Sequence, residues 1–230
     1  QQQTTLVPIG ISADTIATQE GFSREQCDAY AVASQQRAIS ALEQGRFRSV
    51  VPVVDAQGVS LLEQDETPRA QTTLVSLAGL KPAFAAMADK YGIDRLMCER
   101  YGLDRIDHVQ HAGNSPAMAD GASVVLLASP GAAARLGLKP RARILATATV
   151  SVDHTLALTG AVQATQKALT KAGLHIEDID LFEVNESFAS LMLHYMKHLS
   201  VPHDKLNVNG GAIALGHAMG STGSALVGMA

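Results

Sequence analysis

The sequence is poor in aromatic residues and has no tryptophan: Phe, Tyr and Trp together make up 4% of its 230 residues. It also lacks any run of about 18 apolar residues, the length that a membrane-spanning helix requires. Apolar residues nevertheless make up 47% and charged residues 17% of the chain. This balance excludes a disordered chain and predicts a globular protein with a core of small aliphatic side chains, as in tightly packed α/β sheets.

Excess positive charge is also absent. The formal net charge is −4, and Lys and Arg form no block or stripe, which argues against nucleic-acid binding. The two cysteines, Cys27 and Cys98, are too few for a disulfide framework and favour a reducing compartment. We therefore predict a cytoplasmic location, with the mitochondrial or peroxisomal matrix as alternatives.

Neither end of the sequence reads as a natural terminus. The start, QQQTTLVPIG, has neither the basic nor the apolar region of a signal peptide and no initiator Met. The last ten residues, STGSALVGMA, read as a helix that is still running, with no terminating signal. Both ends are expected to be cuts, and the missing strands are expected to leave apolar surface exposed.

The first part of the chain predicts one long helix and then irregular structure. Ser23 and Gln26 form a capping box, apolar residues follow at helical spacing, and Gly45 ends the helix. A short strand is expected over 50–54, at a sheet edge because Pro52 cannot donate to a ladder. Residues 61–107 are rich in charge and turns and predict an elaborated loop region with a helix over 80–89.

From about residue 107 the pattern changes to alternating strands and helices. Strands are expected over 108–112, 124–127, 143–150, 180–184 and 206–208, and helices over 132–136, 162–172, 187–199 and after the last Gly-rich turn. Alternation of this kind indicates βαβ units and a largely parallel sheet. We therefore predict an α/β fold with a loop domain over 1–105 and an α/β domain over 106–230.

The segment over 207–223, NVNGGAIALGHAMGSTG, has the strongest chemical signal in the sequence. Its glycines permit sharp turns, so the loop can direct N–H groups at a ligand. His217 lies inside this loop, where a neutral imidazole held in one orientation can act as a general base. A packed or surface histidine is the alternative, whereas the spacing does not match a phosphate-binding loop.

This segment resembles the thiolase motif N-x-N-G-G-A-I-A-x-G-H-P-x-G-x-[ST]-G. Four further segments resemble thiolase motifs in the same order along the chain: Ile9–Ser12 with Ser23–Asp28, Leu80–Phe84, His111–Ala122, and Phe182–Phe188. The resemblance extends from about residue 8 to the end. It implies the thiolase fold, a mostly parallel mixed sheet with helices on both faces and an inserted irregular loop domain.

The resemblance implies an acyltransferase that cleaves 3-ketoacyl-CoA with CoA to acyl-CoA and acetyl-CoA, as in fatty-acid β-oxidation, or catalyses the reverse condensation. Coenzyme A is then a substrate, and no tightly bound cofactor or metal is expected. Members of the family form oligomers, which implies a homo-oligomer here, with membership of a β-oxidation complex as a further alternative. Three departures from the family pattern, Pro116, Ala157 and the segment Gly160–Gln163, favour the degradative type.

Site residues can be carried over by their match to the family motifs. His217 is implied as the activator of the nucleophilic cysteine and Asn185 as the holder of a water in the oxyanion hole. The glycines expected to shape that loop are Gly210, Gly211 and Gly216. Coenzyme A contacts are implied for Arg69, Ser76, Phe84, Phe188 and Ile9.

The family's nucleophilic cysteine has no counterpart among these residues. Cys27 lies on the inner face of a predicted helix and Cys98 in a charged stretch, so both are expected to be structural. The chain as given is therefore predicted to be inactive, with activity belonging to an intact parent. The alternatives are a non-catalytic CoA-binding or scaffold protein and, among enzymes, a ketosynthase acting on a carrier protein.

Overall fold

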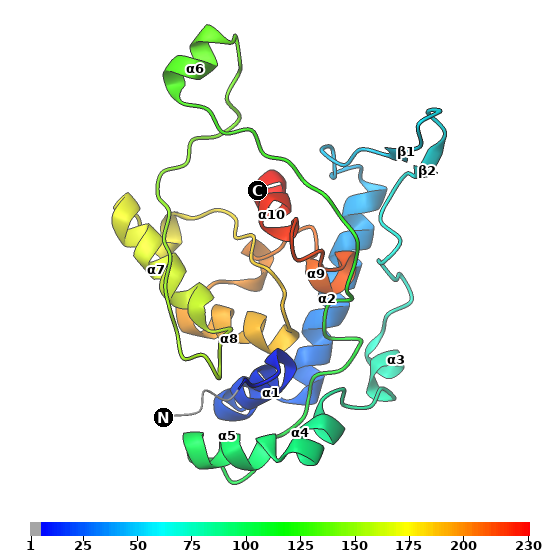
Figure 1. Cartoon of the computed structure of the whole chain (residues 1–230), viewed down its shortest axis with the longest axis vertical. Helices are drawn as coiled ribbons and strands as arrows, with labels where there is room; N and C mark the ends of the chain where they lie inside the picture. Colours follow the sequence, from blue (N-terminus) through cyan, green and yellow to red (C-terminus); the bar gives the residue numbers. More distant parts are fainter. Residues whose placement is uncertain (1–5) are drawn as a thin grey trace.

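The computed structural model describes residues 6–230, and helices dominate it (Figure 1). The expectation about the start of the chain rests partly on residues 1–5, which lie outside the described residues. The helices are α1 (Ile9–Glu20), α2 (Arg24–Glu43), α3 (Leu74–Ala78), α4 (Ala85–Tyr91), α5 (Ile93–Tyr101), α6 (Pro130–Arg135), α7 (Gly160–Ala172), α8 (Ala189–Leu199), α9 (Ala212–Leu215) and α10 (Thr222–Met229), with the 3₁₀ turns η1 (Ile176–Asp178) and η2 (His203–Lys205).

Helix α2 begins at the predicted capping box. The Ser23 Oγ accepts from the Gln26 N–H at 3.2 Å, and the Gln26 Oε1 accepts from the Ser23 N–H at 2.8 Å. Two of the free N–H groups of the first turn are thus satisfied by side chains. The predicted apolar stripe is buried, including Cys27, Tyr30 and Ala31. This confirms the long helix, which ends two residues before Gly45.

Helix α1 was not among the predicted elements. Its residues from Gly10 to Ala17 are all buried, and it ends at Gly21 with a left-handed φ of 73°. A helix covered on all sides shows no polar face, so its sequence lacks the amphipathic period that predicts a helix. Only its packing between other elements, chiefly α8, identifies it.

The main core joins α1 and α2 to α8 and its neighbours. Ile16, Tyr30, Phe188, Met192 and Leu206 belong to the same buried cluster. Residues on both sides of the predicted boundary near 105 therefore share this core. The division into domains 1–105 and 106–230 stays a prediction.

Most of the segments predicted as strands do not pair with a neighbouring strand, so these predictions were wrong. Among the described residues only β1 (Val53–Val54) and β2 (Ser60–Leu62) pair, antiparallel, and β1 falls within the strand expected over 50–54. The segments predicted as strands over 124–127 and 143–150 have no strand beside them, because a strand exists only through a neighbour's backbone. In the described part of the chain, one isolated parallel bridge, Phe182 to Leu206, joins two of the segments predicted as strands.

The unpaired segments expose apolar side chains, as expected. Val124 is 94% exposed, Leu126 75% and Ile144 60%. Figure 1 shows α6 held away from the other elements on the long connections that contain these residues. These segments have the apolar composition of buried strands, but their side chains are exposed to solvent.

The remaining helices follow the predictions with shifted bounds. Helices α6, α7, α8 and α10 occupy the four regions predicted to be helical after residue 107. The loop region holds three short helices instead of one over 80–89, of which α4 overlaps the predicted span. No helix in the described part of the chain has the length and apolarity to cross a membrane.

Candidate active site

His217 lies in the Gly-rich loop between α9 and α10. Its main-chain N–H donates to the Ala117 carbonyl at 2.8 Å, and a parallel bridge joins it to Met118. The loop is therefore tied to a segment about a hundred residues earlier in the chain. His217 is half-buried, so its imidazole is held by its surroundings and is still accessible to solvent.

Thr222 holds the imidazole of His217 through its Nδ1. The Thr222 Oγ1 lies 2.9 Å from the His217 Nδ1 and 2.9 Å from the Ala218 carbonyl oxygen. When the hydroxyl donates to that carbonyl, its oxygen accepts from Nδ1. A neutral imidazole with its proton on Nδ1 keeps a free lone pair on Nε2. This nitrogen can take a proton from a thiol, as a general base requires. The sequence motif contained Thr222, but its role became visible only through this contact.

The three loop glycines are required by close packing. A Cβ on Gly210 would lie 2.6 Å from the Ser34 carbonyl oxygen, and one on Gly211 would lie 2.4 Å from the Glu186 Cδ. Gly216 has a φ of +81°, and a Cβ there would lie 2.7 Å from the Ala119 Cβ. The glycines thus let the loop touch α2 and its neighbours.

The expectation that these glycine N–H groups point at a ligand is wrong. Gly210 donates to the Asn207 carbonyl at 2.9 Å, and Gly216 donates to the Ala212 carbonyl at 2.9 Å. Gly211 donates to the Ser34 Oγ at 3.2 Å. Oxyanion stabilisation would have to come from side chains or from other groups.

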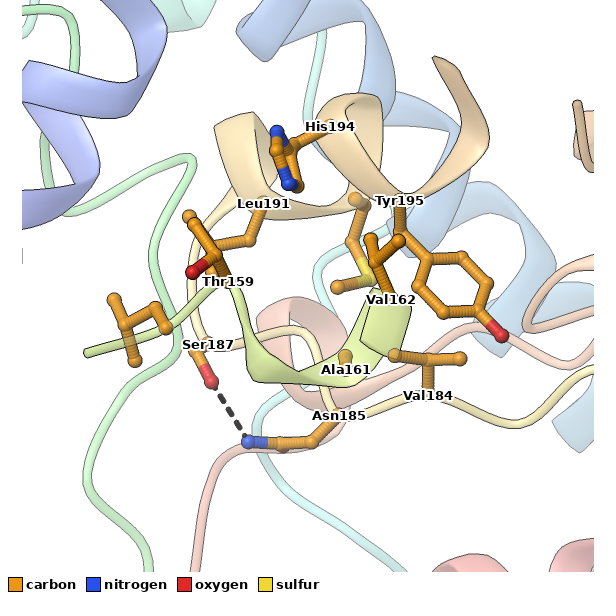
Figure 2. A pocket seen from close by; sticks show the side chains of 11 residues that line it. Thr159, Ala161, Val162, Val184, Asn185, Ser187, Leu191, His194 and Tyr195 are labelled. Atoms are coloured by element: carbon orange, nitrogen blue, oxygen red, sulfur yellow. Dashed lines mark hydrogen bonds between the residues drawn. The ribbon is translucent and has the colours of Figure 1, made fainter. Parts of the chain in front are cut away.

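Asn185 has a free acceptor in a buried position. Its Nδ2 donates to the Ser187 Oγ at 3.0 Å, whereas its Oδ1 is buried without a hydrogen-bond partner (Figure 2). A buried amide oxygen without a partner is costly unless a water or ligand group donates to it. This geometry suits the water-holding role implied for Asn185.

Asn207 connects the segment containing Asn185 to the His217 loop. Its side-chain Oδ1 accepts from the Val184 N–H at 2.8 Å, and its Nδ2 donates to the Val184 carbonyl at 2.9 Å. The Asn207 side chain therefore forms the two hydrogen bonds to the Val184 main chain that a neighbouring strand would form. These bonds hold the segment containing Asn185 against the start of the His217 loop.

Asn185 and the surroundings of His217 line one cavity of about 620 Å³. Its wall includes Asn185 together with Gly216, Ala218 and Thr222 from the loop. The rest of the wall comes from the β1–β2 region, from residues 119–124 and from α10. Asn185 also borders a second cavity of about 150 Å³, lined mainly by apolar side chains of α7 and α8 (Figure 2).

Two glutamates near Asn185 in the sequence, Glu183 and Glu186, had no predicted role. Glu186 is fully buried and accepts from the Tyr30 hydroxyl and the Ser34 hydroxyl, each at 2.7 Å, and from the Ile213 N–H at 3.0 Å. Glu183 has a buried oxygen without a partner, and burial, with a contribution from Glu186, raises its pKa to about 7. The motif letters contained both residues, but the donors to Glu186 come from segments that are distant in the sequence.

The residues implied in coenzyme A binding separate into two groups. Phe84 and Phe188 meet edge to face, with ring centroids 5.9 Å apart at 75°. Gly10 lies against this pair, since a Cβ there would reach the Phe84 ring at 2.1 Å, and the preceding residue, Ile9, is exposed. The aromatic pair and the α1 N-terminus therefore lie together.

Arg69 and Ser76 lie on an exposed segment. The Arg69 N–H donates to the Gln35 Oε1 at 2.7 Å, which leaves its guanidinium in solvent. The Ser76 Oγ accepts from the Thr73 N–H at 2.9 Å within the capping box of α3. Ser76 has a local structural role in addition to any ligand contact.

Neither cysteine is activated. Cys27 is fully buried, and burial raises its thiol pKa to about 12. Burial also raises the pKa of Cys98. A nucleophilic cysteine needs the opposite shift, which a nearby cation or helix N-terminus produces. The prediction that both are structural agrees with these environments.

Similarity to solved structures defines the class of the fold. The structure matches the Bacillus anthracis acetyl-CoA acetyltransferase with a TM-score of 0.82 and 33% identity, over 97% of this chain and 52% of that one. It matches human mitochondrial 3-ketoacyl-CoA thiolase in complex with CoA with a TM-score of 0.83 and 36% identity, over 96% of this chain and 51% of that one. The chain is therefore an α/β protein of the thiolase fold.

Family models identify the chain further. The model of the thiolase N-terminal domain matches residues 1–98, and that of the thiolase C-terminal domain matches residues 138–230. The acetyl-CoA acetyltransferase of Pseudomonas aeruginosa is 42% identical over 94% of this chain, and the peroxisomal 3-ketoacyl-CoA thiolase B of Rattus norvegicus is 41% identical over 95%. The chain belongs to the thiolase family. It spans about half the length of these relatives, 51% and 49% respectively.

Proposed function

We propose that this chain forms the histidine side of a thiolase active site, which acts on 3-ketoacyl-CoA and CoA once a nucleophilic cysteine is supplied. The observation that carries the proposal is the His217–Thr222 contact, which occupies the Nδ1 of His217 and leaves its Nε2 available to act as a base. Asn185, with its unpartnered buried Oδ1 on the wall of the adjoining cavity, is the proposed holder of the oxyanion-hole water.

The proposed chemistry uses His217 twice. Its Nε2 takes the proton of the cysteine thiol, and the resulting thiolate attacks the substrate carbonyl. The imidazolium so formed then faces the developing oxyanion together with the water held by Asn185. Donors fixed where negative charge develops commonly give the largest part of such a rate enhancement. Cys27 is buried and unactivated, so it is not the nucleophile.

Two names among the relatives support the substrate class. The similar proteins are named acetyl-CoA acetyltransferase and 3-ketoacyl-CoA thiolase, and one similar structure is a complex with CoA. We propose coenzyme A thioesters as the substrates on this basis, with Phe84 and Phe188 beside the pantetheine arm. The acyl-chain length, the compartment and the oligomeric state stay predictions.

The test is a chimera. Residues 6–230 would replace the matching segment of the Pseudomonas aeruginosa relative, which supplies the remaining half of a thiolase. We expect thiolysis of acetoacetyl-CoA by the chimera and a loss of at least about 100-fold in kcat for H217A, within the range for general-base removal. A folded chimera whose H217A variant keeps its activity would refute the role of His217.

The 230-residue chain alone gives a second readout. Incubated with acetyl-CoA, it is expected to form no covalent thioester, which mass spectrometry of the intact chain measures directly. The chimera provides the positive control. A stoichiometric acyl adduct on Cys27 or Cys98 would overturn the proposal that the nucleophile lies outside these residues.

A further inference from the structure

A cluster of two histidines and one glutamate lies where α1 meets α8. His194 and His198 are four residues apart on α8 and therefore project from the same face of that helix. Glu20 is the last residue of α1, which packs against α8, and the two helices lie side by side in Figure 1. The tertiary fold brings together three metal-ligating side chains from opposite ends of the sequence.

The three candidate ligand atoms lie close together. The Nδ1 of His194 lies 2.9 Å and the Nε2 of His198 lies 2.6 Å from the same oxygen, Oε1 of Glu20. The three ligand atoms are all within 4.8 Å of one another. No catalytic or coenzyme A role was assigned to any of these residues.

We propose that Glu20, His194 and His198 form a binding site for a divalent transition-metal ion such as Zn²⁺, with solvent completing its coordination. Imidazole and carboxylate are suitable ligands for Zn²⁺, at about 2.0–2.2 Å. A tetrahedral ion with such bonds separates its ligand atoms by about 3.3 Å. The present separations of 2.6 and 2.9 Å must therefore widen by about half an ångström.

The surroundings permit this adjustment. The His198 side chain is 43% exposed, so it can rotate, whereas those of His194 and Glu20 are only 12% and 16% exposed and are held in place. Lys197 pairs with the other carboxylate oxygen, Oε2 of Glu20, at 2.8 Å and leaves Oε1 to the histidines. Two of the proposed ligands, His194 and Glu20, are thus held in place, and the third, His198, can move to adjust the coordination.

The site also adjoins a cavity. His194 lines the 150 Å³ cavity that Asn185 borders, and Figure 2 shows His194 and Asn185 at opposite ends of the view. The ion would connect the end of α1 to α8, next to this cavity, and should stabilise that contact. The proposal stands independently of the proposed enzymatic function.

The test is titration of the 230-residue chain, free of metal, with Zn²⁺ by calorimetry and with Co²⁺ by its visible absorption. We expect one saturable site per chain. H194A and H198A should each weaken binding by at least about 100-fold, the upper end of the loss caused by removing an orienting partner alone. H175A, which removes an exposed histidine elsewhere, should leave the affinity unchanged.

Two further variants separate a metal site from an ion-pair network. K197M removes a positive charge next to the ion and should keep or tighten binding, whereas E20Q should weaken it. Because His198 is partly exposed, H198A spares the fold, which circular dichroism verifies. Absence of saturable binding, or binding that H194A and H198A leave intact, would overturn the proposal and identify the cluster as an ion-pair network only.

Discussion

Replacement of Glu186 by glutamine is expected to destabilise the fold strongly although it changes few atoms. Glu186 is fully buried, and its two oxygens accept hydrogen bonds from four donors. Oε1 accepts from Tyr30 and Asn207, and Oε2 accepts from Ser34 and Ile213. An amide keeps one acceptor oxygen but presents an NH₂ group in place of the other.

Either orientation of the amide leaves one donor without an acceptor. If the NH₂ replaces Oε2, the hydroxyl of Ser34 can rotate to accept, but the main-chain N–H of Ile213 cannot. If it replaces Oε1, the NH₂ of Asn207 is left facing another donor. A buried unsatisfied donor costs about 1–3 kcal/mol, and the remaining bonds lose their charge assistance. We therefore expect E186Q to lose about 3 kcal/mol of the free energy of unfolding.

Urea unfolding followed by far-UV circular dichroism measures this loss, since the chain has no Trp to serve as a fluorescent probe. With an m-value of about 3 kcal/mol/M, the midpoint should fall by about 1 M. E186A should lose more, and the exposed Glu177 provides the control E177Q, expected within about 0.5 kcal/mol of the parent. A midpoint for E186Q equal to that of E177Q would refute the reasoning.

Three further outcomes are expected. The hydrogen bond to Asp14 raises the pKa of His108 to about 9 from 6.5, so the stability it gives is complete below pH 6.5 and is lost as the pH rises through 9. H108N should remove a pH-dependent loss of up to about 3 kcal/mol from urea-unfolding profiles, and coincident profiles would contradict this. G211A should lower the free energy of unfolding by about 2 kcal/mol or more, because its Cβ would lie 2.4 Å from the Glu186 Cδ. The control G228A has open space around the new Cβ and should stay within about 1 kcal/mol of the parent. Equal unfolding midpoints for the two variants would argue against the packing role of Gly211. Burial and a pKa of about 12 should keep Cys27 of the native C98S variant unlabelled by iodoacetamide until denaturant is added, and rapid native labelling would show that the environment is misjudged.

Local signals in the sequence were sufficient for several features. The capping box at Ser23 and the helical spacing behind it predicted α2, because hydrogen bonds within one turn and one apolar face decide where a helix begins and what it buries. The Gly-rich loop around His217 was recognised from its letters, since few sequences place so many glycines about one histidine. The structural status of Cys27 also followed from its position on the inner face of α2.

Other features required the tertiary structure because their determinants are distant in the chain. Helix α1 shows no amphipathic period, since it is covered on all sides, and the predicted strands at 124–127 and 143–150 have no neighbour to pair with. The donors to Glu186 come from residues up to 156 positions away, and Glu20 meets His194 across 174 positions. The sequence by itself therefore determined the family, α2 and the candidate histidine, whereas folding alone decided the buried carboxylate network, the His217–Thr222 contact and the Glu20–His194–His198 cluster. Each of these depends on hydrogen bonds and packing between segments that only the folded chain brings into contact.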